Sequence, residues 1–383
     1  MKVNSILFVV VILVVVIAAG CVGEEIGEDV GNDAEITDYN WSAPGFDTDF
    51  SRMIIDPAEI LSGGPPKDGI PAIDNPQYQS IEDAESWLVD REPVILVRVG
   101  ETSRIYPLQI LTWHEIINDE INGTPLAVTF CPLCNTGIVF RRQVDDRILD
   151  FGTTGRLRNS NLIMYDRQTE TWWQQATGNA VIGELVGERL SIHPSLTLSF
   201  GDVRTIDPDA DVVSRETGYS RPYGRNPYAN YDTPGNRPFL FSGEVDPALD
   251  AMERVLVLQH GGEELVVTYE SVRERGVLSA DMAGDTIILF WSAGTASALD
   301  DADISEGRDV GSLNGFLAMV GDAVLDFESL GDGRFTDIQT GSIWNSGGRA
   351  LEGDYAGERL VPVTGIRHFW FSARAFSDGE LVQ

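Results

Sequence analysis

Two cysteines in the motif C-P-L-C, Cys131 and Cys134, are the residues of this sequence best suited to chemistry. They stand at the end of a predicted strand, in the run T-F-C-P-L-C-N-T-G. A disulfide between them would close so small a loop that it would stabilise the fold by only about 2 kcal/mol. The spacing instead suits thiol–disulfide exchange, in which one thiolate attacks and the other resolves the mixed disulfide. It also suits the binding of a soft metal ion.

The residues around this C-x-x-C motif argue against three common contexts. Asn135 follows the second cysteine, so the motif is not the C-x-x-C-H signature of haem attachment. A thioredoxin-type site would continue as a helix, whereas Gly137 and the strand-forming run 138–140 follow here. A single C-x-x-C pair is also a weak zinc signature, because two further ligands would have to come from elsewhere.

The sequence has four histidines that could assist the cysteines. His114 lies on a predicted helix shortly before the C-P-L-C motif, and His368 lies in the run R-H-F-W-F near the C-terminus. Either one could ligate a metal or act as the base that lowers the pKa of a cysteine. His193, before a proline, and His260, in a glycine-rich turn, are expected to be ordinary packed or solvated residues.

Three functions are therefore compatible with these residues. In the first, the protein is a thiol–disulfide oxidoreductase that uses Cys131, Cys134 and His114 and requires no cofactor. In the second, it binds copper or zinc through Cys131, Cys134, His114 and His368. In the third, it is a non-catalytic surface binding module with an inert disulfide. The sequence names neither a substrate nor a redox or protein partner, and a C-x-x-C motif by itself leaves all three open.

The elements that must position these residues are mostly strands. Short runs of strand-forming residues bounded by Gly, Asn, Asp and Pro occur at 94–99, 126–131, 138–142, 162–165 and 171–174. The run D-R-Q-T-E-T-W-W predicts a hairpin with its turn near 167–170. One helix is predicted from Pro107 to about Asn118, with Ile117 in its apolar stripe. We expect a mainly β fold with a few short helices, of the α+β class.

Two stretches of the sequence match each other and indicate an internal duplication. The pattern D-x-Q-T-x-[TS]-x-W occurs at 166–173 and at 337–344, and G-x-x-x-G-E-R-L follows at 183–190 and at 353–360. We interpret the region 46–375 as two tandem copies of a β-rich unit packed together, at about 90–195 and 252–365. A segment at 269–275 is the expected partner of the predicted helix. Trp172, Trp173 and Trp344 are expected in the core.

The second copy has no cysteines. Its matching strand end carries W-S-A-G-T-A-S-A from Trp291, so a site at the C-P-L-C motif would be asymmetric. A linker at 196–251 joins the copies, and its segment 218–237 is rich in Tyr, Pro and Arg. We interpret this segment as an ordered connection that wraps the two lobes, with a loop that covers a site as the alternative. The polar run Arg158–Asn161 is either a solvated loop or an anchor for a substrate.

The N-terminus has the pattern of an exported lipoprotein. Lys2 precedes the apolar run 6–17, and Ala18, Ala19 and Gly20 stand directly before Cys21. This predicts a signal peptide at 1–20 and a lipid on Cys21, with an uncleaved anchor helix as the alternative. Residues 21–45 are acidic and poor in apolar side chains, and they are expected to be an extended tether. Both alternatives place the domain outside the cytoplasm, and the first anchors it to the outer face of the membrane.

The charge balance excludes some partners. There are 60 acidic and 27 basic residues, for a formal charge of −33, and only two of the basic residues are lysines. Such a surface repels nucleic acids and anionic lipid headgroups. In molar salt the Debye length falls to about 3 Å, which screens the self-repulsion of so acidic a protein. The composition therefore suggests a halophilic archaeal source.

Several long runs resemble the domain-of-unknown-function 3179 family of archaeal and bacterial exported proteins. They are Y-P-L-Q-I-L-T-W-H-E-I-I-N-D-E-I-N-G from Tyr106, V-T-F-C-P-L-C-N-T-G, F-G-T-T-G-R-L-R-N-S-N-L-I-M-Y-D-R-Q-T-E-T-W-W-Q-Q-A-T-G, G-T-A-S-A-L-D and H-F-W-F-S-A-R-A-F. The resemblance covers nearly all of the chain after the tether and implies no assigned activity. Some members are described as selenoprotein candidates. The resemblance implies that such members carry a selenocysteine at the position of Cys131 or Cys134, which would favour a redox nucleophile there. This sequence has cysteine at both positions.

Overall fold

A computed structural model describes residues 41–382. The expected signal peptide, the lipid-bearing Cys21 and the tether up to residue 40 lie outside the described residues. Residues 41–45, which the sequence assigns to the tether, are part of the fold. Trp41 packs edge-on against Phe50 and Trp172, with ring centroids 5.2 and 5.7 Å apart. Between residues 41 and 382, no helix is long and apolar enough to cross a bilayer.

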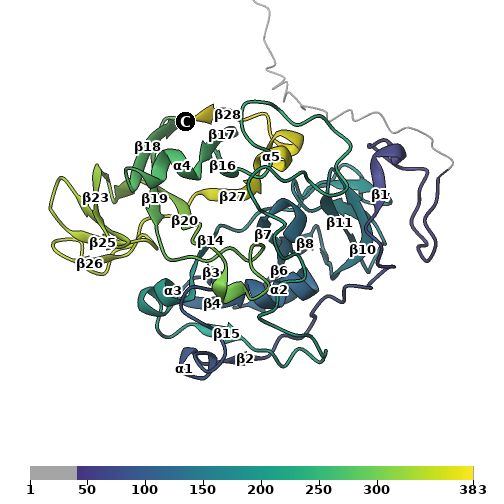
Figure 1. Ribbon diagram of the computed structural model, residues 1–383, viewed down its shortest axis with the longest axis horizontal. Coiled ribbons are helices and arrows are strands. Elements are labelled where there is room, and N and C mark those ends of the chain that lie inside the picture. Colours follow the sequence, from purple (N-terminus) through teal and green to yellow (C-terminus); the bar gives the residue numbers. More distant parts are fainter. Residues whose placement is uncertain (1–40, 383) are drawn as a thin grey trace, which may run out of the picture. The chain divides into compact units, whose positions relative to one another are not determined.

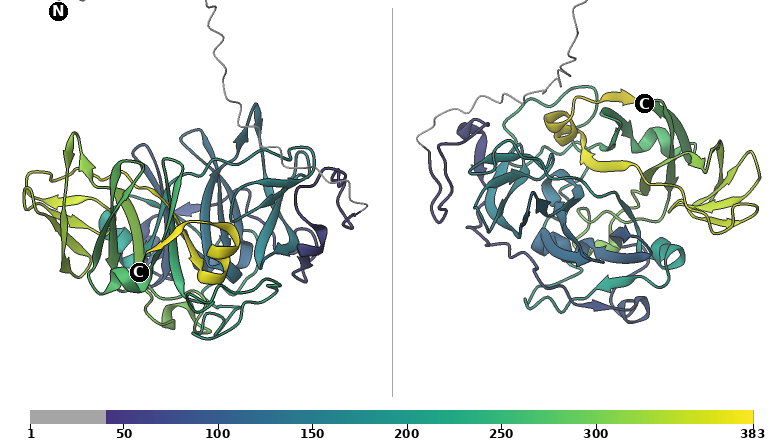
Figure 2. Two further views of the ribbon diagram at one scale, coloured as in Figure 1. Left: turned by 90° about the horizontal axis from the view of Figure 1, so that it is seen from above. Right: turned by 180° about the vertical axis from the view of Figure 1, so that it is seen from behind.

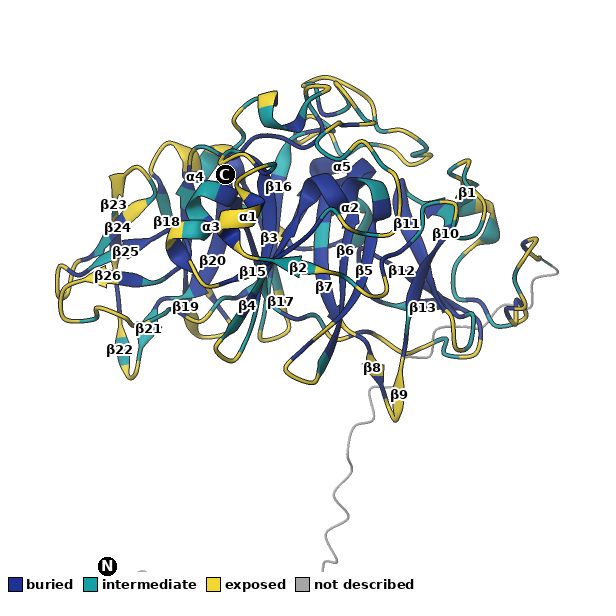
Figure 3. Cartoon of the chain, turned by 90° about the horizontal axis from the view of Figure 1, so that it is seen from below, coloured by how far each residue is buried: buried dark blue, intermediate teal, exposed yellow. Residues whose placement is uncertain are grey.

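The fold is mainly β, as the sequence predicts. Strands make up 42% of the structure and helices 11%. The strands form small sheets and hairpins that are antiparallel except for two parallel pairs within the described region. Figure 3 shows that the central strands are buried, whereas the tips of two hairpins are exposed. These hairpins are β8 (Gln143–Val144) with β9 (Arg147–Ile148), and β21 (Met319–Val320) with β22 (Ala323–Val324). Two of the apolar clusters each contain residues of both halves of the sequence, so the halves pack against each other.

The segment before residue 93 packs onto strands that come later in the chain. It holds the 3₁₀ helix η1 (Pro57–Glu59), β1 (Ile60–Ser62), β2 (Tyr78–Gln79) and the helix α1 (Ile81–Ala84). Strand β1 pairs with β10 (Phe151–Arg158), and β2 pairs with β15 (Asp211–Val213). Between β1 and β2, the backbone N–H groups of Gly63 and Asp68 donate to carbonyls of β10. These bonds fix the loop 63–70 beside β10.

Residues 93–213 form what we call the N-terminal half. Its first sheet has the order β14-β3-β4-β15, made of β3 (Pro93–Val99), β4 (Thr102–Pro107), β14 (Ser195–Ser199) and β15. Its second sheet is made of β5 (Ile116–Ile121), β6 (Thr124–Cys131) and β7 (Thr136–Arg141). Its third sheet is made of β10, β11 (Asn161–Asp166), β12 (Trp172–Gln174) and β13 (Ala180–Ile182). Shorter elements connect the sheets: α2 (Leu108–His114), η2 (Pro132–Cys134), β8 (Gln143–Val144), β9 (Arg147–Ile148) and α3 (Phe200–Ile206).

Residues 254–382 form the C-terminal half. Its first sheet has the order β27-β16-β17-β28, made of β16 (Arg254–His260), β17 (Glu263–Thr268), β27 (Thr364–Phe369) and β28 (Glu380–Val382). The second is made of β18 (Val277–Met282), β19 (Asp285–Ser292) and β20 (Ser312–Leu317). The third is made of β23 (Phe327–Gly331), β24 (Arg334–Asp337), β25 (Ile343–Asn345) and β26 (Ala350–Glu352). The connecting elements are α4 (Tyr269–Arg273), η3 (Ile304–Glu306), β21 (Met319–Val320), β22 (Ala323–Val324) and α5 (Trp370–Phe376).

The two halves thus follow the same order of elements (Figure 1). The tryptophans of the repeated sequence pattern make the same contact in each, because Trp173 Nε1 donates to Asp166 Oδ2 at 2.9 Å and Trp344 Nε1 donates to Asp337 Oδ2 at 3.0 Å. Both tryptophans and Trp172 are fully buried, as the sequence predicts. The repeated pattern is therefore a hairpin turn that the indole and the carboxylate hold closed.

Two boundaries differ from the sequence-based expectation. The predicted linker 196–251 loses its first part, because β14, α3 and β15 complete the first sheet of the N-terminal half. Only 214–253 connects the halves, and it contains neither helix nor strand (Figure 2). The predicted helix also ends four residues early, at His114, because Glu115 adopts a left-handed backbone conformation with φ of 59°. Ile117 therefore belongs to β5 and not to a helical stripe.

Candidate functional site

The C-P-L-C motif forms the tight connection between β6 and β7. Strand β6 ends at Cys131, one 3₁₀ turn covers Pro132–Cys134, and Asn135 turns the chain into β7 with a left-handed φ of 56°. Cys131 pairs with Thr136 across the two strands, which fixes the register of the turn. Both cysteines are free thiols, and they are 2% and 0% exposed. The turn therefore holds a buried dithiol.

The hairpin between β10 and β11 supplies the partners of both thiols. Asn159 and Ser160 form its two-residue turn, each with a left-handed backbone, as expected of a type I′ turn. The Cys131 thiol donates to the Ser160 carbonyl at 3.7 Å, and the Cys134 thiol donates to the Asn159 carbonyl at 3.9 Å. The polar run Arg158–Asn161 is therefore not simply a solvated loop, because Ser160 and Asn161 are buried and its backbone holds the dithiol.

The surroundings of the dithiol favour its protonated form. Burial raises the pKa of the Cys131 thiol well above its usual range, and the hydrogen bond and charge of Cys134 raise it further. A backbone N–H group of Leu162 opposes this shift without outweighing it. The net effect of these neighbours disfavours the Cys131 thiolate.

Glu115 is the carboxyl group that lies beside this thiol. It is only 7% exposed, and burial together with the charge of Cys131 raises its pKa well above the usual range. The Glu115 carbonyl accepts from the N–H of Phe130 at 2.8 Å, which fixes Glu115 beside the end of β6. Local sequence patterns do not single out this residue. Its only signal was an acidic side chain inside the apolar stripe of the predicted helix.

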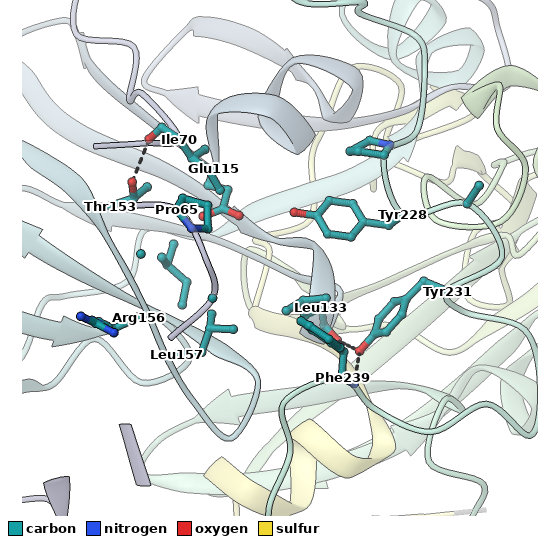
Figure 4. A pocket seen from close by; sticks show the side chains of 15 residues that line it. Pro65, Ile70, Glu115, Leu133, Thr153, Arg156, Leu157, Tyr228, Tyr231 and Phe239 are labelled. Carbon is teal, nitrogen blue, oxygen red and sulfur yellow. Dashed lines mark hydrogen bonds between the residues drawn. The ribbon is translucent and has the colours of Figure 1, made fainter. Parts of the chain in front are cut away.

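A cavity of about 400 Å³ opens in front of Glu115 and of Leu133, the residue between the two cysteines. Its walls come from the loop 63–70, from β10 and β11, and from residues 227–239 of the connection between the halves. Most of the lining side chains are apolar. Figure 4 shows the Glu115 carboxyl and the Tyr228 hydroxyl pointing toward each other across this space.

The segment 218–237, which we call the cover, lies over the cavity and also connects the halves. The hydroxyl of Tyr231 donates to the Leu133 carbonyl at 3.0 Å and accepts from the N–H of Phe239 at 3.3 Å. The Ser160 hydroxyl in turn donates to the Phe239 carbonyl. The cover therefore bonds to the C-P-L-C turn, and Phe239, which follows it, bonds to the hairpin that holds the thiols.

Asp232 ties this cover to the C-terminal half. Its carboxylate is fully buried and pairs with Arg254 and Arg308 at 2.5 and 2.8 Å. Burial opposes the charge, but Arg254, Ser297 and Arg308 together keep the pKa of Asp232 below its usual range. The loop 293–311 between β19 and β20 also bonds to the cover through its backbone, for example from Tyr231 N–H to the Leu299 carbonyl at 3.1 Å. The half without cysteines thus holds the cover in place.

The same positions can be identified in the C-terminal half from matching hydrogen bonds. The N–H of Glu115 donates to the Leu111 carbonyl at 2.6 Å, as that of Gly276 donates to the Val272 carbonyl at 2.7 Å. Trp291 N–H then donates to the Gly276 carbonyl, just as Phe130 N–H donates to that of Glu115. By strand register, Gly276 matches Glu115 and Ser292 matches Cys131.

The family model described as a protein of unknown function (DUF3179) matches residues 67–380. The chain belongs to the DUF3179 family. No curated protein and no solved structure matches it. The matched region of the DUF3179 domain includes both cysteines, Glu115 and the covering segment, whereas Gly63 and Pro65 of the cavity wall precede it.

The two selected histidines of the DUF3179 domain have partners other than the cysteines. His114 Nδ1 donates to the Pro71 carbonyl at 2.7 Å, so its Nε2 accepts from the Tyr223 hydroxyl at 2.6 Å. Burial lowers the pKa of His114, and it lowers that of His368 to about 3. His368 bonds to Ser372 and does not line the cavity. Within residues 41–382, no group of three or more His, Cys, Asp or Glu side chains is placed to hold a metal ion.

Proposed function

We propose that this protein is a thiol-based oxidoreductase in which Cys131 and Cys134 are the redox pair and Glu115 accepts the proton of Cys131. The observation that carries this proposal is the position of Glu115, a buried carboxyl beside a buried thiol. Its left-handed backbone is disfavoured by about 1–2 kcal/mol for any residue with a Cβ, and the matching residue in the other half is a glycine. Since neither the backbone nor the burial of a carboxyl favours glutamate here, its presence is better explained by chemistry than by stability.

The reaction follows from these neighbours. When Glu115 is ionised, its carboxylate takes the proton from the Cys131 thiol, and the thiolate attacks one sulfur of a small disulfide that serves as oxidant. A mixed disulfide forms and the first thiolate leaves, taking up a proton. Cys134 then attacks the Cys131 sulfur, which closes the C-P-L-C disulfide and releases the second thiol. His114 has a positioning role, since its ring holds Tyr223 of the covering segment.

The reduction potential of the dithiol tests this function. The reduced protein is equilibrated in dithiothreitol redox buffers, and the remaining thiols are alkylated and counted by mass spectrometry. The two thiol–carbonyl bonds stabilise the reduced form, so we expect a potential above about −300 mV. A value well below that figure would mark an inert structural disulfide and refute the proposal. The Cys131→Ser variant controls for alkylation of other groups.

We also propose that the two halves are tandem copies of one unit, of which only the first kept or acquired the redox residues. The matching element order and the matching indole–carboxylate pairs support this. Separate substitutions of the two tryptophans test it and are described below.

The location of the reaction is a further part of the proposal. The sequence pattern around Cys21 supports export and attachment to the outer face of the membrane through a lipid. Intact-mass measurement of membrane-extracted protein should give a chain that starts at Cys21 and carries the added lipid. The formal charge of −33 supports a halophilic source, and unfolding in low-salt buffer with recovery in molar salt is the expected behaviour.

A further inference from the structure

The dithiol is closed to a large reaction partner. Cys131 and Cys134 are at most 2% exposed, and Tyr231 bonds directly to the turn between them. A disulfide on the surface of another protein therefore has no path to either sulfur while the cover is in place. The cavity of about 400 Å³ is within the range of small-molecule pockets. Neither cysteine lines it, but Leu133 of the C-P-L-C turn forms part of its wall, and so does Glu115, whose pKa responds to the charge of Cys131.

The residues that line the cavity indicate which class of ligand it can bind. Most of the walls are apolar, as at Leu157, Pro227 and Phe239. Thr153 and Arg156 also line the cavity, and the Thr153 hydroxyl donates to the Ile70 carbonyl. The Glu115 carboxyl and the Tyr228 hydroxyl point toward each other, and no hydrogen bond joins either of them to another residue of the lining (Figure 4). Burial raises the pKa of both groups, which favours their protonated forms, and in that form each can donate a hydrogen bond. A matching ligand is flat or compact, apolar and uncharged, and it presents acceptor oxygens.

The net charge of the protein further restricts the class of ligand. The chain has a formal charge of −33, so it repels anionic oxidants such as peptide disulfides that carry several carboxylates. A ligand of the dithiol must also accept two electrons and two protons. Among neutral apolar molecules with carbonyl acceptors, quinones meet both requirements.

We infer that the cavity binds a neutral quinone, which oxidises the Cys131–Cys134 dithiol. This inference rests on the proposed function and names its oxidant. In the reaction, the two S–H bonds break and one S–S bond forms. The two electrons and two protons appear on the quinone oxygens as the quinol. Tyr228 and Glu115 would bind the two sides of the quinone, and Glu115 would also pass on the proton of Cys131.

The test uses the full chain, reduced and freed of excess reductant, with tetramethyl-1,4-benzoquinone as the probe. All ring carbons of this quinone are substituted, so direct arylation of thiols is suppressed. We expect one quinone to be reduced per protein, with loss of both thiols measured by alkylation. Binding is measured separately by quenching of tryptophan fluorescence in the Cys131→Ser/Cys134→Ser double variant, which cannot react.

Matched tyrosine variants locate the binding site. Tyr228→Phe removes one donor and keeps the ring, and we expect quinone binding to weaken about tenfold. Tyr219→Phe removes the hydroxyl of an exposed tyrosine of the same segment that does not line the cavity, and it should leave binding unchanged. Because both comparisons can be made with the thiols intact, they remain informative if the double variant does not fold.

The outcomes separate this inference from the function on which it rests. If the quinone neither binds nor oxidises the protein while hydroxyethyl disulfide does oxidise it, the quinone inference is overturned and the thiol function stands. Equal binding by the Tyr228→Phe and Tyr219→Phe variants also overturns it. If neither oxidant converts the dithiol to a disulfide, the proposed function itself fails.

Discussion

The two halves of the molecule each have a cavity at the same place in the element order, and the two cavities differ in kind. In the N-terminal half, the junction of α2 and β5, the end of β6 and the strands β10 and β11 enclose an apolar space around Glu115. In the C-terminal half, the junction of α4 and β18, the end of β19 and the β23–β24 hairpin border about 560 Å³. That second space is lined by charged groups such as Arg273, Arg275 and Asp309. The two cavities are bordered by matching backbone elements, and they differ in the side chains that line them.

The connection after the matched strand is the second difference. In the N-terminal half, the short turn 132–135 leads from β6 to β7 and carries Cys134. In the C-terminal half, the loop 293–311 leads from β19 to β20 and reaches the cover of the first cavity. One half therefore supplies the two buried thiols, and the other holds the segment that lies over them. This difference indicates that the two halves form one structural unit, although they follow the same order of elements.

The largest effect is expected when the N-terminal half is made to resemble the C-terminal half at its reactive atom. Cys131→Ser installs the side chain that Ser292 has at the matching position, which is also buried. Its hydroxyl can donate to the Ser160 carbonyl, so we expect the free energy of unfolding to fall by only about 1–2 kcal/mol. Reduction of an added oxidant, followed by absorbance, should be lost completely.

The Cys134→Ser variant is the matched control for this loss. Cys131 keeps its thiol there, so a small disulfide should accumulate as a mixed disulfide on Cys131, detected by mass spectrometry. An adduct on Cys134 in the Cys131→Ser variant, instead of on Cys131, would reverse the roles of the two sulfurs.

The second largest effect is expected at the link between the halves. Asp232→Asn leaves the half-buried Arg308 with Asp300 but deprives the largely buried Arg254 of its carboxylate. Removing one partner of a buried ion pair costs about 3–5 kcal/mol, so the unfolding midpoint in denaturant should fall sharply. Loosening the cover should also speed the reaction of Cys131 and Cys134 with a bulky aromatic disulfide reagent. A destabilised variant with unchanged thiol reactivity would mean that Asp232 supports the fold without closing the site.

Much of this fold could be predicted from local sequence. Runs of strand formers between turn residues gave β3, β6, β7, β11 and β12, and the repeated D-x-Q-T pattern gave the hairpin turns. The end of α2 could not be predicted, because Ile116 and Ile117 fit an apolar helical stripe as well as a strand. What ends the helix is the left-handed conformation of Glu115, which has no signature in a residue that is not glycine.

The site was predictable only in part, for a similar reason. The C-P-L-C motif is contiguous and was selected from its residue types alone. The groups around it lie far apart in the sequence, since the cavity draws on residues near 65, 115, 157 and 228. His114 was selected because it precedes the motif, yet Pro71 and Tyr223 determine its role through long-range contacts. The local sequence identified the two thiols as candidates but not the residues that surround them.

A third, smaller effect exchanges the residues at the matched left-handed position. Glu115→Gly relieves the backbone strain, so at pH 4 the free energy of unfolding should rise by about 1 kcal/mol. The folded-state pKa of Glu115 lies above its unfolded value of about 4.3. The contribution of Glu115 to the stability of the wild type is therefore fully present below the unfolded-state pKa. It is lost as the pH rises from there through the folded-state pKa. The advantage of the variant should grow by up to about 1.4 kcal/mol per pH unit in that window, measured by denaturant unfolding.

The reverse substitution provides the control for this position. Gly276 has φ of 73°, and a Cβ there would lie 2.4 Å from Ser329 Oγ. Gly276→Ala should therefore destabilise the domain by about 1–2 kcal/mol with no dependence on pH. If Glu115→Gly were no more stable than the wild type at pH 8, Glu115 would have a structural role, and its assignment as the proton acceptor would lose its main support.

The smallest effect is expected at the tryptophan–aspartate hydrogen bond that both halves contain. Trp173→Phe and Trp344→Phe each remove an indole N–H from a buried aspartate that keeps its bonds to the neighbouring threonine. Each should lower the free energy of unfolding by about 1–2 kcal/mol, and the two losses should agree within about 0.5 kcal/mol. The double variant should show the sum, because the two sites share no partners. A loss at one tryptophan that exceeded the other by more than about 2 kcal/mol would argue against equivalent scaffolds. The asymmetry of the domain would then extend beyond its reactive residues to the frame that carries them.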